Sequence, residues 1–233
     1  MHCRLIIFFF SCSYLSVVAQ PADNLSSYFS EIRSGKSTAL YKILKKYSKK
    51  DIDVSVQDSL LSFLDRRYPH LEDLIRIIGF AGPQKSIIKL KDYITPHNSP
   101  TIRWSALLAL SRLGDADAIH DVMHRARKLE VNDAVVNNLF PDLIYTRQRQ
   151  AIDYVIEILM SDKLSCESVN NDSPSAIPCG YRIMEQLAPV IKNYPLALDG
   201  SGDIKTNDYK KSLGIVRHWF RKNRNYIIDD SKF

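Results

Sequence analysis

Apolar side chains recur at helical spacing along almost the whole of this 233-residue chain. In the segment 71–78, for example, leucine and isoleucine stand at positions i, i+3, i+4 and i+7, which share one face of an α-helix. No stretch alternates apolar and polar residues over the length of two paired strands, so we expect no β-strands. The spacing therefore predicts an all-α protein in which each helix buries one apolar face.

Residues that start and stop helices divide this pattern into segments. Ser99 followed by Pro100 is typical of a helix start, because serine caps free N–H groups and proline lacks one. Gly114 is typical of a helix end, and Asp115 can cap the next helix. The predicted helices are 24–34, 37–48, 55–67, 71–80, 84–94, 100–113, 116–129, 133–145, 148–161, 181–193 and 207–225. Because the connections are short, consecutive helices are expected to pack antiparallel.

The helical pattern also repeats along the chain. An apolar motif that begins at Ala118 recurs 33 residues later at Ala151, and a similar register begins 32 residues earlier at Ser86. A pair of helices cannot bury its apolar face alone, whereas stacked copies share one continuous core. The repetition therefore predicts a stack of helix pairs.

One copy carries a more specific pattern. Arg103 is followed by a helix of small residues and leucines, then by Leu-Gly-Asp at 113–115 and Ala-Ile at 118–119. The stretch 101–119 thus resembles a repeat of the short HEAT type, as in the bilin-lyase-like repeat families, and Pro141 and Pro189 are similar to the kinking prolines of HEAT helices. The resemblance implies a right-handed α–α superhelix of antiparallel helix pairs, clearest at 84–161, whose usual role is to bind another macromolecule.

Two residues of this repeat have expected structural roles. The resemblance implies that Arg103 bridges neighbouring repeats through an aspartate such as Asp115. Trp104 stands beside the apolar stripe of its helix, so we expect it to be partly buried rather than to be a surface anchor for a ligand.

The first nineteen residues differ from the rest and are typical of a secretory signal peptide. Arg4 is the only charged residue before Asp23, and the stretches 5–10 and 15–19 are apolar. Val17 and Ala19 are small enough for signal peptidase, so we expect cleavage after Ala19 and export to the periplasm or outside the cell. The mature chain, 20–233, is then a single domain.

Other roles for the N-terminus fit the sequence less well. A membrane anchor would need a longer apolar stretch to cross the ~30 Å of bilayer hydrocarbon. A lipoprotein would use Cys12, but bulky phenylalanines precede it. The mature chain is expected to contain no stable membrane span.

The mature chain keeps two cysteines, Cys166 and Cys179, at the ends of a polar, turn-rich segment. In an oxidising compartment this arrangement predicts a disulfide that closes the loop 163–180. The alternative is a pair of metal ligands, but no histidine or third cysteine lies nearby in the sequence.

Candidate chemistry elsewhere is sparse. His120 and His124 stand at i and i+4 on one helix, a spacing that metalloprotease helices use for zinc, but no third ligand is apparent and two solvated histidines are the simpler interpretation. The sequence contains no serine nucleophile elbow, phosphate-binding loop or dinucleotide fingerprint. We therefore assign no catalytic residue, cofactor or metal.

The last predicted helix, 207–225, carries a run of cations without an acid. Its basic residues are Lys210, Lys211, Arg217, Arg221, Lys222 and Arg224. The run is typical either of the solvated cap that ends a solenoid or of a surface for an anionic partner.

These observations predict a secreted or periplasmic, non-catalytic scaffold module that binds another protein. One alternative is a basic surface for nucleic acid or an anionic glycan. The other is a metal-dependent hydrolase or lyase on the same scaffold, which would use His120 and His124. The mild net charge of +6 favours none of them.

Overall fold

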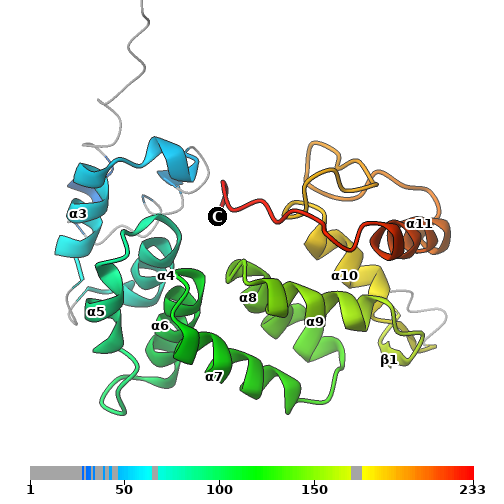
Figure 1. The fold of residues 1–233 in the computed structure, drawn as a ribbon, viewed down its shortest axis with the longest axis horizontal. Helices are drawn as coiled ribbons and strands as arrows, with labels where there is room; N and C mark the ends of the chain where they lie inside the picture. Colours follow the sequence, from blue (N-terminus) through cyan, green and yellow to red (C-terminus); the bar gives the residue numbers. More distant parts are fainter. Residues whose placement is uncertain are drawn as a thin grey trace, which may run out of the picture.

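The computed structural model describes residues 28, 30–32, 34, 39, 42–43, 47–64, 68–168 and 175–233 (Figure 1). These residues are predominantly α-helical, as the apolar spacing predicts. The predicted signal peptide at 1–19 lies outside the described residues, and so does most of the predicted helices at 24–34 and 37–48. None of the described helices has the length and apolar character that crossing a bilayer requires.

The elements are short, and a long irregular segment leads from α10 to α11. In chain order they are the 3₁₀ turn η1 (Lys49–Asp51), α3 (Val54–Ser62), α4 (Leu71–Ala81), α5 (Ser86–Lys91), α6 (Pro100–Arg112), α7 (Ala116–Arg127), the π-helical turn η2 (Val135–Leu139), α8 (Phe140–Tyr145), α9 (Arg149–Leu159), β1 (Leu164–Cys166), β2 (Ile177–Pro178), α10 (Gly180–Leu187) and α11 (Tyr209–Lys222).

The predicted helix starts after Ser99 and Asp115 are confirmed. The Ser99 hydroxyl accepts the N–H of Ile102 at 3.3 Å. Asp115 Oδ1 accepts the N–H of Ala118 at 3.0 Å. Gly114, between α6 and α7, has a φ of +89°, a conformation that glycine adopts without steric cost.

Prolines interrupt the regular α-helical ladder in two of the predicted helices. The predicted helix 133–145 is helical over its full length, but its middle part, η2, is π-helical, and Pro141 lies in the first turn of α8, which follows. Proline has no N–H and crowds the carbonyl four residues earlier, so it interrupts a regular helical ladder. The predicted helix 181–193 ends at Leu187, just before Pro189.

Alternate helices stack on one another. α4 packs on α6, α6 on α8 and α8 on α10, while α5, α7 and α9 pack against helices that adjoin them in the chain. α4 and α6 approach closely at Gly79, where an added Cβ would lie 2.6 Å from the Ala109 Cα. Glycine is needed there, because a larger side chain would force the two helices apart.

The buried apolar side chains form two clusters. The N-terminal core contains residues between Ile32 and Ala118, and the C-terminal core contains residues between Leu108 and Tyr226. Leu107 packs against both clusters, so α6 joins the two halves of the molecule.

The segment between the cysteines corrects the expectation that the chain has no strands. β1 and β2 pair antiparallel, with Leu164 opposite Pro178. Next to them the sulfurs of Cys166 and Cys179 lie 2.12 Å apart, so the predicted disulfide is confirmed. Strands this short leave no alternating pattern in the sequence, and the disulfide brings their backbone groups within bonding reach.

The last residues of the chain return to the junction between the two cores (Figure 1). The Arg112 side chain is fully buried there, and its guanidinium carbon lies 4.8 Å from the ring centres of Phe80 and Tyr145. The ring of Phe233 lies 5.8 Å from the same carbon. Arg112 also donates to Asp230 Oδ1 at 3.2 Å. We name this contact of residues 229–233 with the junction the C-terminal clasp.

Two further cations hold the clasp. The Lys49 ammonium pairs with Asp230 at 2.5 Å. Arg147 Nε donates to the Asp229 carbonyl at 3.0 Å. Burial and the neighbouring charge of Arg112 lower the pKa of Arg147 to about 10. The clasp thus ties the end of the C-terminal half to residues of the N-terminal half.

Candidate binding surface around the last helix

α11 carries the acid-free run of cations, and one of its faces is buried. Asp208 caps the helix, since its Oδ1 accepts the N–H of Lys211 at 2.8 Å. Leu213, Val216 and Phe220 pack into the C-terminal core. The cations therefore occupy the remaining faces, and the structure places them in three different settings.

The structure gives Arg217 a role that the charge pattern does not reveal. Its side chain is only 14% exposed. Nε donates to the Leu159 carbonyl at 2.8 Å, and Nη2 donates to the Ser161 carbonyl at 2.7 Å. Nη1 pairs with Asp162 at 2.5 Å. Because α9 ends at Leu159, Arg217 satisfies carbonyl groups that the helix end leaves free, and it is not part of an open basic surface.

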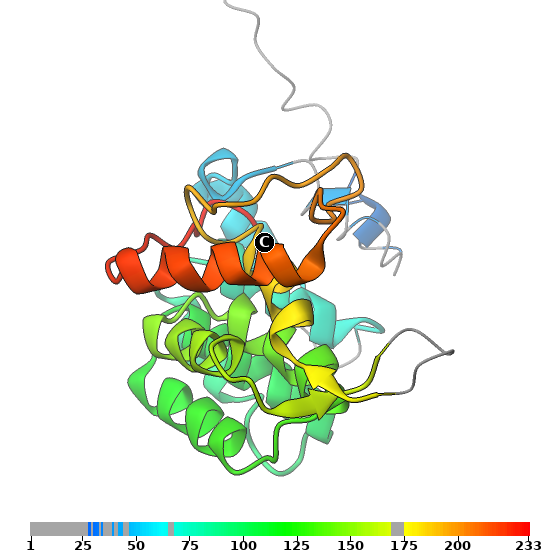
Figure 2. The same cartoon turned by 90° about the vertical axis from the view of Figure 1, so that its right-hand side faces the viewer.

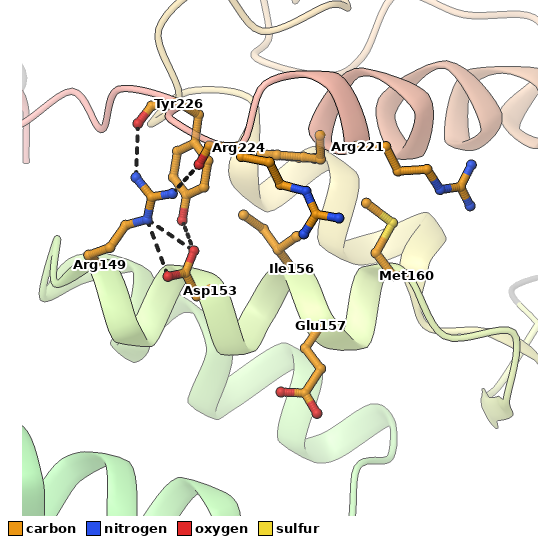
Figure 3. A pocket seen from close by; sticks show the side chains of 9 residues that line it. Arg149, Asp153, Ile156, Glu157, Met160, Arg221, Arg224 and Tyr226 are labelled. Atoms are coloured by element: carbon orange, nitrogen blue, oxygen red, sulfur yellow. Dashed lines mark hydrogen bonds and ion pairs between the residues drawn. The ribbon is translucent and has the colours of Figure 1, made fainter.

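Arg221 and Arg224 line a pocket of about 500 Å³ between α9, α11 and the chain that follows α11 (Figure 3). Both arginines are exposed, and no ion pair joins either of them to another described residue. Ile156 and Met160 form the apolar wall that α9 contributes. The carboxylate of Glu157 points away from the two guanidinium groups in Figure 3.

A hydrogen-bonded cluster of Arg149, Asp153 and Tyr226 closes one end of this pocket. Asp153 accepts Arg149 Nε at 3.0 Å and the Tyr226 hydroxyl at 2.6 Å. The Arg149 guanidinium carbon also lies 3.8 Å from the ring centre of Tyr226. Burial, and then the hydrogen bond to Asp153, raises the pKa of Tyr226, so its hydroxyl stays a donor. Since Arg149 and Asp153 neutralise each other, the free positive charge belongs to Arg221 and Arg224.

The lysines of the predicted surface lie elsewhere on the helix. Lys210, Lys211 and Lys222 are all exposed. Lys211 and Lys222 line a separate hollow of about 440 Å³ around Trp219, on another flank of α11 from Arg221. The acid-free run is therefore divided between two sides of the helix.

The two histidines singled out in the sequence lie on the exposed side of α7. The rings of His120 and His124 stack with their centres 5.9 Å apart. The part of the chain that the structure describes contains no group of three or more His, Cys, Asp or Glu side chains arranged to hold a metal. The pair alone would supply two ligands, and protein zinc sites use three or four.

In the repeat that resembles HEAT sequences, the prediction for Trp104 is confirmed, whereas Asp115 has a different partner from the predicted one. Trp104 is half-buried, as predicted, and its Nε1 donates to Asp142 at 2.6 Å. Asp115 pairs with Lys91 at 2.9 Å rather than with Arg103, because the end of α5 lies beside the corner between α6 and α7.

The contribution of α9 to the pocket was not predicted from the sequence. Arg149, Asp153, Ile156 and Met160 follow one another at i, i+4, i+7 and i+11, so they lie along one stripe of the helix. A stripe that combines charged and apolar residues in this way is a feature of the sequence that could have identified this face of α9 as a candidate binding face. It does not reveal that α11 lies opposite, because this depends on how the helices pack.

Comparison with models of protein families, with curated proteins and with solved structures finds no match to this chain. The class of the protein is therefore defined by its own fold and chemistry. It is an all-α protein with one disulfide among its described residues and an arginine-lined pocket beside its last helix.

Proposed function

We propose that the protein is an exported, non-catalytic binding module that takes up an acidic, partly apolar segment of another protein between α9 and α11. The observation that carries this proposal is the position of Arg221 and Arg224 beside Ile156 and Met160 in one pocket. A guanidinium binds a carboxylate through two parallel hydrogen bonds, and the apolar wall fits an aliphatic side chain. Arginine and methionine are also enriched where proteins meet.

The scaffold that we propose for this module is a short, right-handed HEAT-like superhelix. The stacking of α4, α6, α8 and α10, with α5, α7 and α9 packed beside them, supports it, and so does the sequence period of 32 to 33 residues. Each repeat in such a fold buries its apolar face against the next, and the terminal helix is a cap. As that cap, α11 has sides that are free to meet a partner.

Export is supported by two independent features. The apolar stretches at 5–10 and 15–19, with small residues at Val17 and Ala19, have the layout of a cleaved signal peptide. The disulfide between Cys166 and Cys179 is of a kind that persists in oxidising compartments.

A nucleic acid or an anionic glycan is the competing ligand. Proteins usually follow such polymers with a continuous row of cations. Here Arg217 is bonded within the fold, and Lys211 and Lys222 lie on another side of α11 from Arg221. The row is interrupted, and a short acidic segment fits the geometry better.

The test is binding of a fluorescein-labelled peptide of alternating glutamate and leucine, measured by fluorescence anisotropy. The double variant Arg221→Gln/Arg224→Gln is expected to weaken binding about tenfold to 100-fold, since charge-assisted hydrogen bonds are lost from a partly solvated site. The matched control is Lys205→Gln/Lys210→Gln, which removes the same charge from exposed positions outside the pocket. Its affinity is expected to stay within about twofold of the wild type.

Two results would contradict the proposal. Equal losses in the two double variants would show that overall charge, not the pocket, attracts the peptide. Tighter binding of single-stranded DNA than of the peptide, with a steep dependence on salt, would assign the surface to a polymer instead.

A further inference from the structure

One flank of α11, beside its buried face, carries apolar side chains that the fold leaves exposed or half-buried. Ile215 and Trp219 stand one turn apart on this flank, where Ile215 is 41% exposed and Trp219 is half-buried, with one part of its ring against Tyr194 and Phe220. Ile227, in the chain after the helix, is 58% exposed. Single exposed isoleucines are common in proteins, but a group of large apolar side chains marks a contact surface.

Two adjoining hollows gather these side chains into one surface. They have volumes of about 440 Å³ and about 370 Å³, and Trp219 and Lys222 line both, so the two hollows lie next to each other. The residues that define this surface, which we name the Trp219 surface, are Ile215, Trp219, Ile227, Lys192, Lys211 and Lys222.

The charge of the Trp219 surface is of one sign. Every described residue that lines the two hollows is neutral or basic. The pocket between α9 and α11 differs, because Asp153 and Glu157 contribute to its lining. The Trp219 surface therefore combines an apolar centre with lysines around it and no carboxylate among them.

We propose that the Trp219 surface docks the protein on an anionic phospholipid bilayer. Tryptophan is stable at the level of lipid headgroups, because its ring is apolar and its N–H can bond to water or phosphate. Ile215 and Ile227 would enter the edge of the acyl region. Lysine stems lie along the apolar layer while their ammonium groups reach the phosphates.

The placement of α11 suits a flat partner. The helix lies across one outer face of the molecule, which is turned to the viewer in Figure 2. A bilayer covers such a face without needing complementary acids at fixed positions, whereas a protein partner would have to supply them. The docking is peripheral, and it does not depend on the function proposed for the pocket between α9 and α11.

The first test is cosedimentation of the full-length protein with vesicles of phosphatidylcholine, alone or with about 30 mol% phosphatidylglycerol. The wild type is expected to sediment with the anionic vesicles only, and added salt should release it. Lys211→Gln/Lys222→Gln is expected to lower the partition coefficient about 30-fold. The matched control, Lys89→Gln/Lys128→Gln, removes the same charge from exposed positions outside the two hollows and should bind as the wild type does.

The second test locates the contact. Vesicles that contain brominated phosphatidylcholine should quench the emission of Trp219, and Trp219→Phe should leave only the unquenched emission of Trp104, the other tryptophan of the chain. Sedimentation without quenching, or equal binding of the two lysine double variants, would overturn the proposal. Absence of binding to anionic vesicles would also overturn it, and glutamate–leucine peptide binding that depends on Lys211 and Lys222 would then assign the surface to a protein.

Discussion

The C-terminal clasp and the pocket between α9 and α11 both contain arginines, but the two regions use them differently. In the clasp, Arg112 is fully buried between aromatic rings and bonded to Asp230. In the pocket, Arg221 and Arg224 are exposed and have no ion pair with another described residue. The same side chain therefore stabilises the fold in one region and is available to a ligand in the other.

The difference shows that the setting of a cation, not its place in a charge pattern, determines its role. Arg217 belongs to the same run as Arg221, yet like Arg112 it is held within the fold, in its case by hydrogen bonds and an ion pair at the end of α9. Substitutions in the clasp should change the free energy of unfolding, and substitutions in the pocket should change binding alone.

The largest effect is expected for Phe80→Ala in the clasp. Phe80 is fully buried, and its ring contacts both Phe233 and the Arg112 guanidinium. Removing a buried ring should lower the free energy of unfolding by about 3 to 5 kcal/mol. Urea denaturation measures it, with Ile215→Ala on the exposed side of α11 as the control, for which a change within about 0.5 kcal/mol is expected. Similar values for the two variants would refute the contrast between the regions.

A smaller effect is expected for Asp230→Asn. The change leaves the buried Arg112 guanidinium with less compensating charge, a loss of about 3 to 5 kcal/mol in fully buried pairs. Water reaches Asp230, which is 46% exposed, so we expect about 2 kcal/mol. Arg112→Met, which removes the buried charge itself, should cost less than Asp230→Asn, and the reverse order in urea denaturation would mean that the pair is not the stabilising feature.

Arg217→Gln tests whether a cation of α11 can contribute to the free energy of unfolding without contributing to peptide binding. Loss of the bonds to the carbonyls of Leu159 and Ser161 should lower the free energy of unfolding by about 1 to 2 kcal/mol. The affinity for the glutamate–leucine peptide should not change, because the Arg217 side chain is not among the residues that line the pocket. A stable variant with weakened binding would place Arg217 in the binding surface after all.

The smallest effect concerns pH. Burial tends to raise the pKa of Asp115, but the hydrogen bonds from Lys91 and the Ala118 N–H outweigh it and hold the pKa below its ordinary value of 3.8. A lowered pKa adds stability above the unfolded value and loses it as the pH falls through the folded one. Thermal unfolding should therefore show about 1 kcal/mol less stability as the pH drops below 4. Asp115→Asn should lack this part of the decline, and an identical pH profile would exclude Asp115 as its source.

Much of the fold could be predicted because helical spacing is a local property. The apolar stripes, the serine and aspartate caps and Gly114 each act within one or two helical turns. Their effects therefore depend only on residues that are close together in the sequence. The π-helical turn η2 and the early end of α10 were missed because the effect of a proline on a helix depends on which carbonyl its ring crowds. The β1–β2 pairing was missed because strands of three and two residues are too short to show an alternating pattern.

The candidate site was only half predicted for a related reason. The acid-free run identified Arg221 and Arg224, since charge is visible along the chain. The apolar wall of Ile156 and Met160 comes from another helix, and only tertiary packing brings it opposite. The bonding of Arg217 to the end of α9 has the same origin, so sequence alone could not separate it from its neighbours.

The most direct test of this account measures unfolding and peptide binding on the same two proteins, Arg221→Gln/Arg224→Gln and Arg217→Gln. The account predicts a crossed result, in which the double variant keeps the wild-type free energy of unfolding and loses affinity, while Arg217→Gln loses stability and keeps affinity. If the double variant were instead destabilised, or if both proteins lost affinity to the same extent, the division of the α11 cations into bonded and free groups would be wrong.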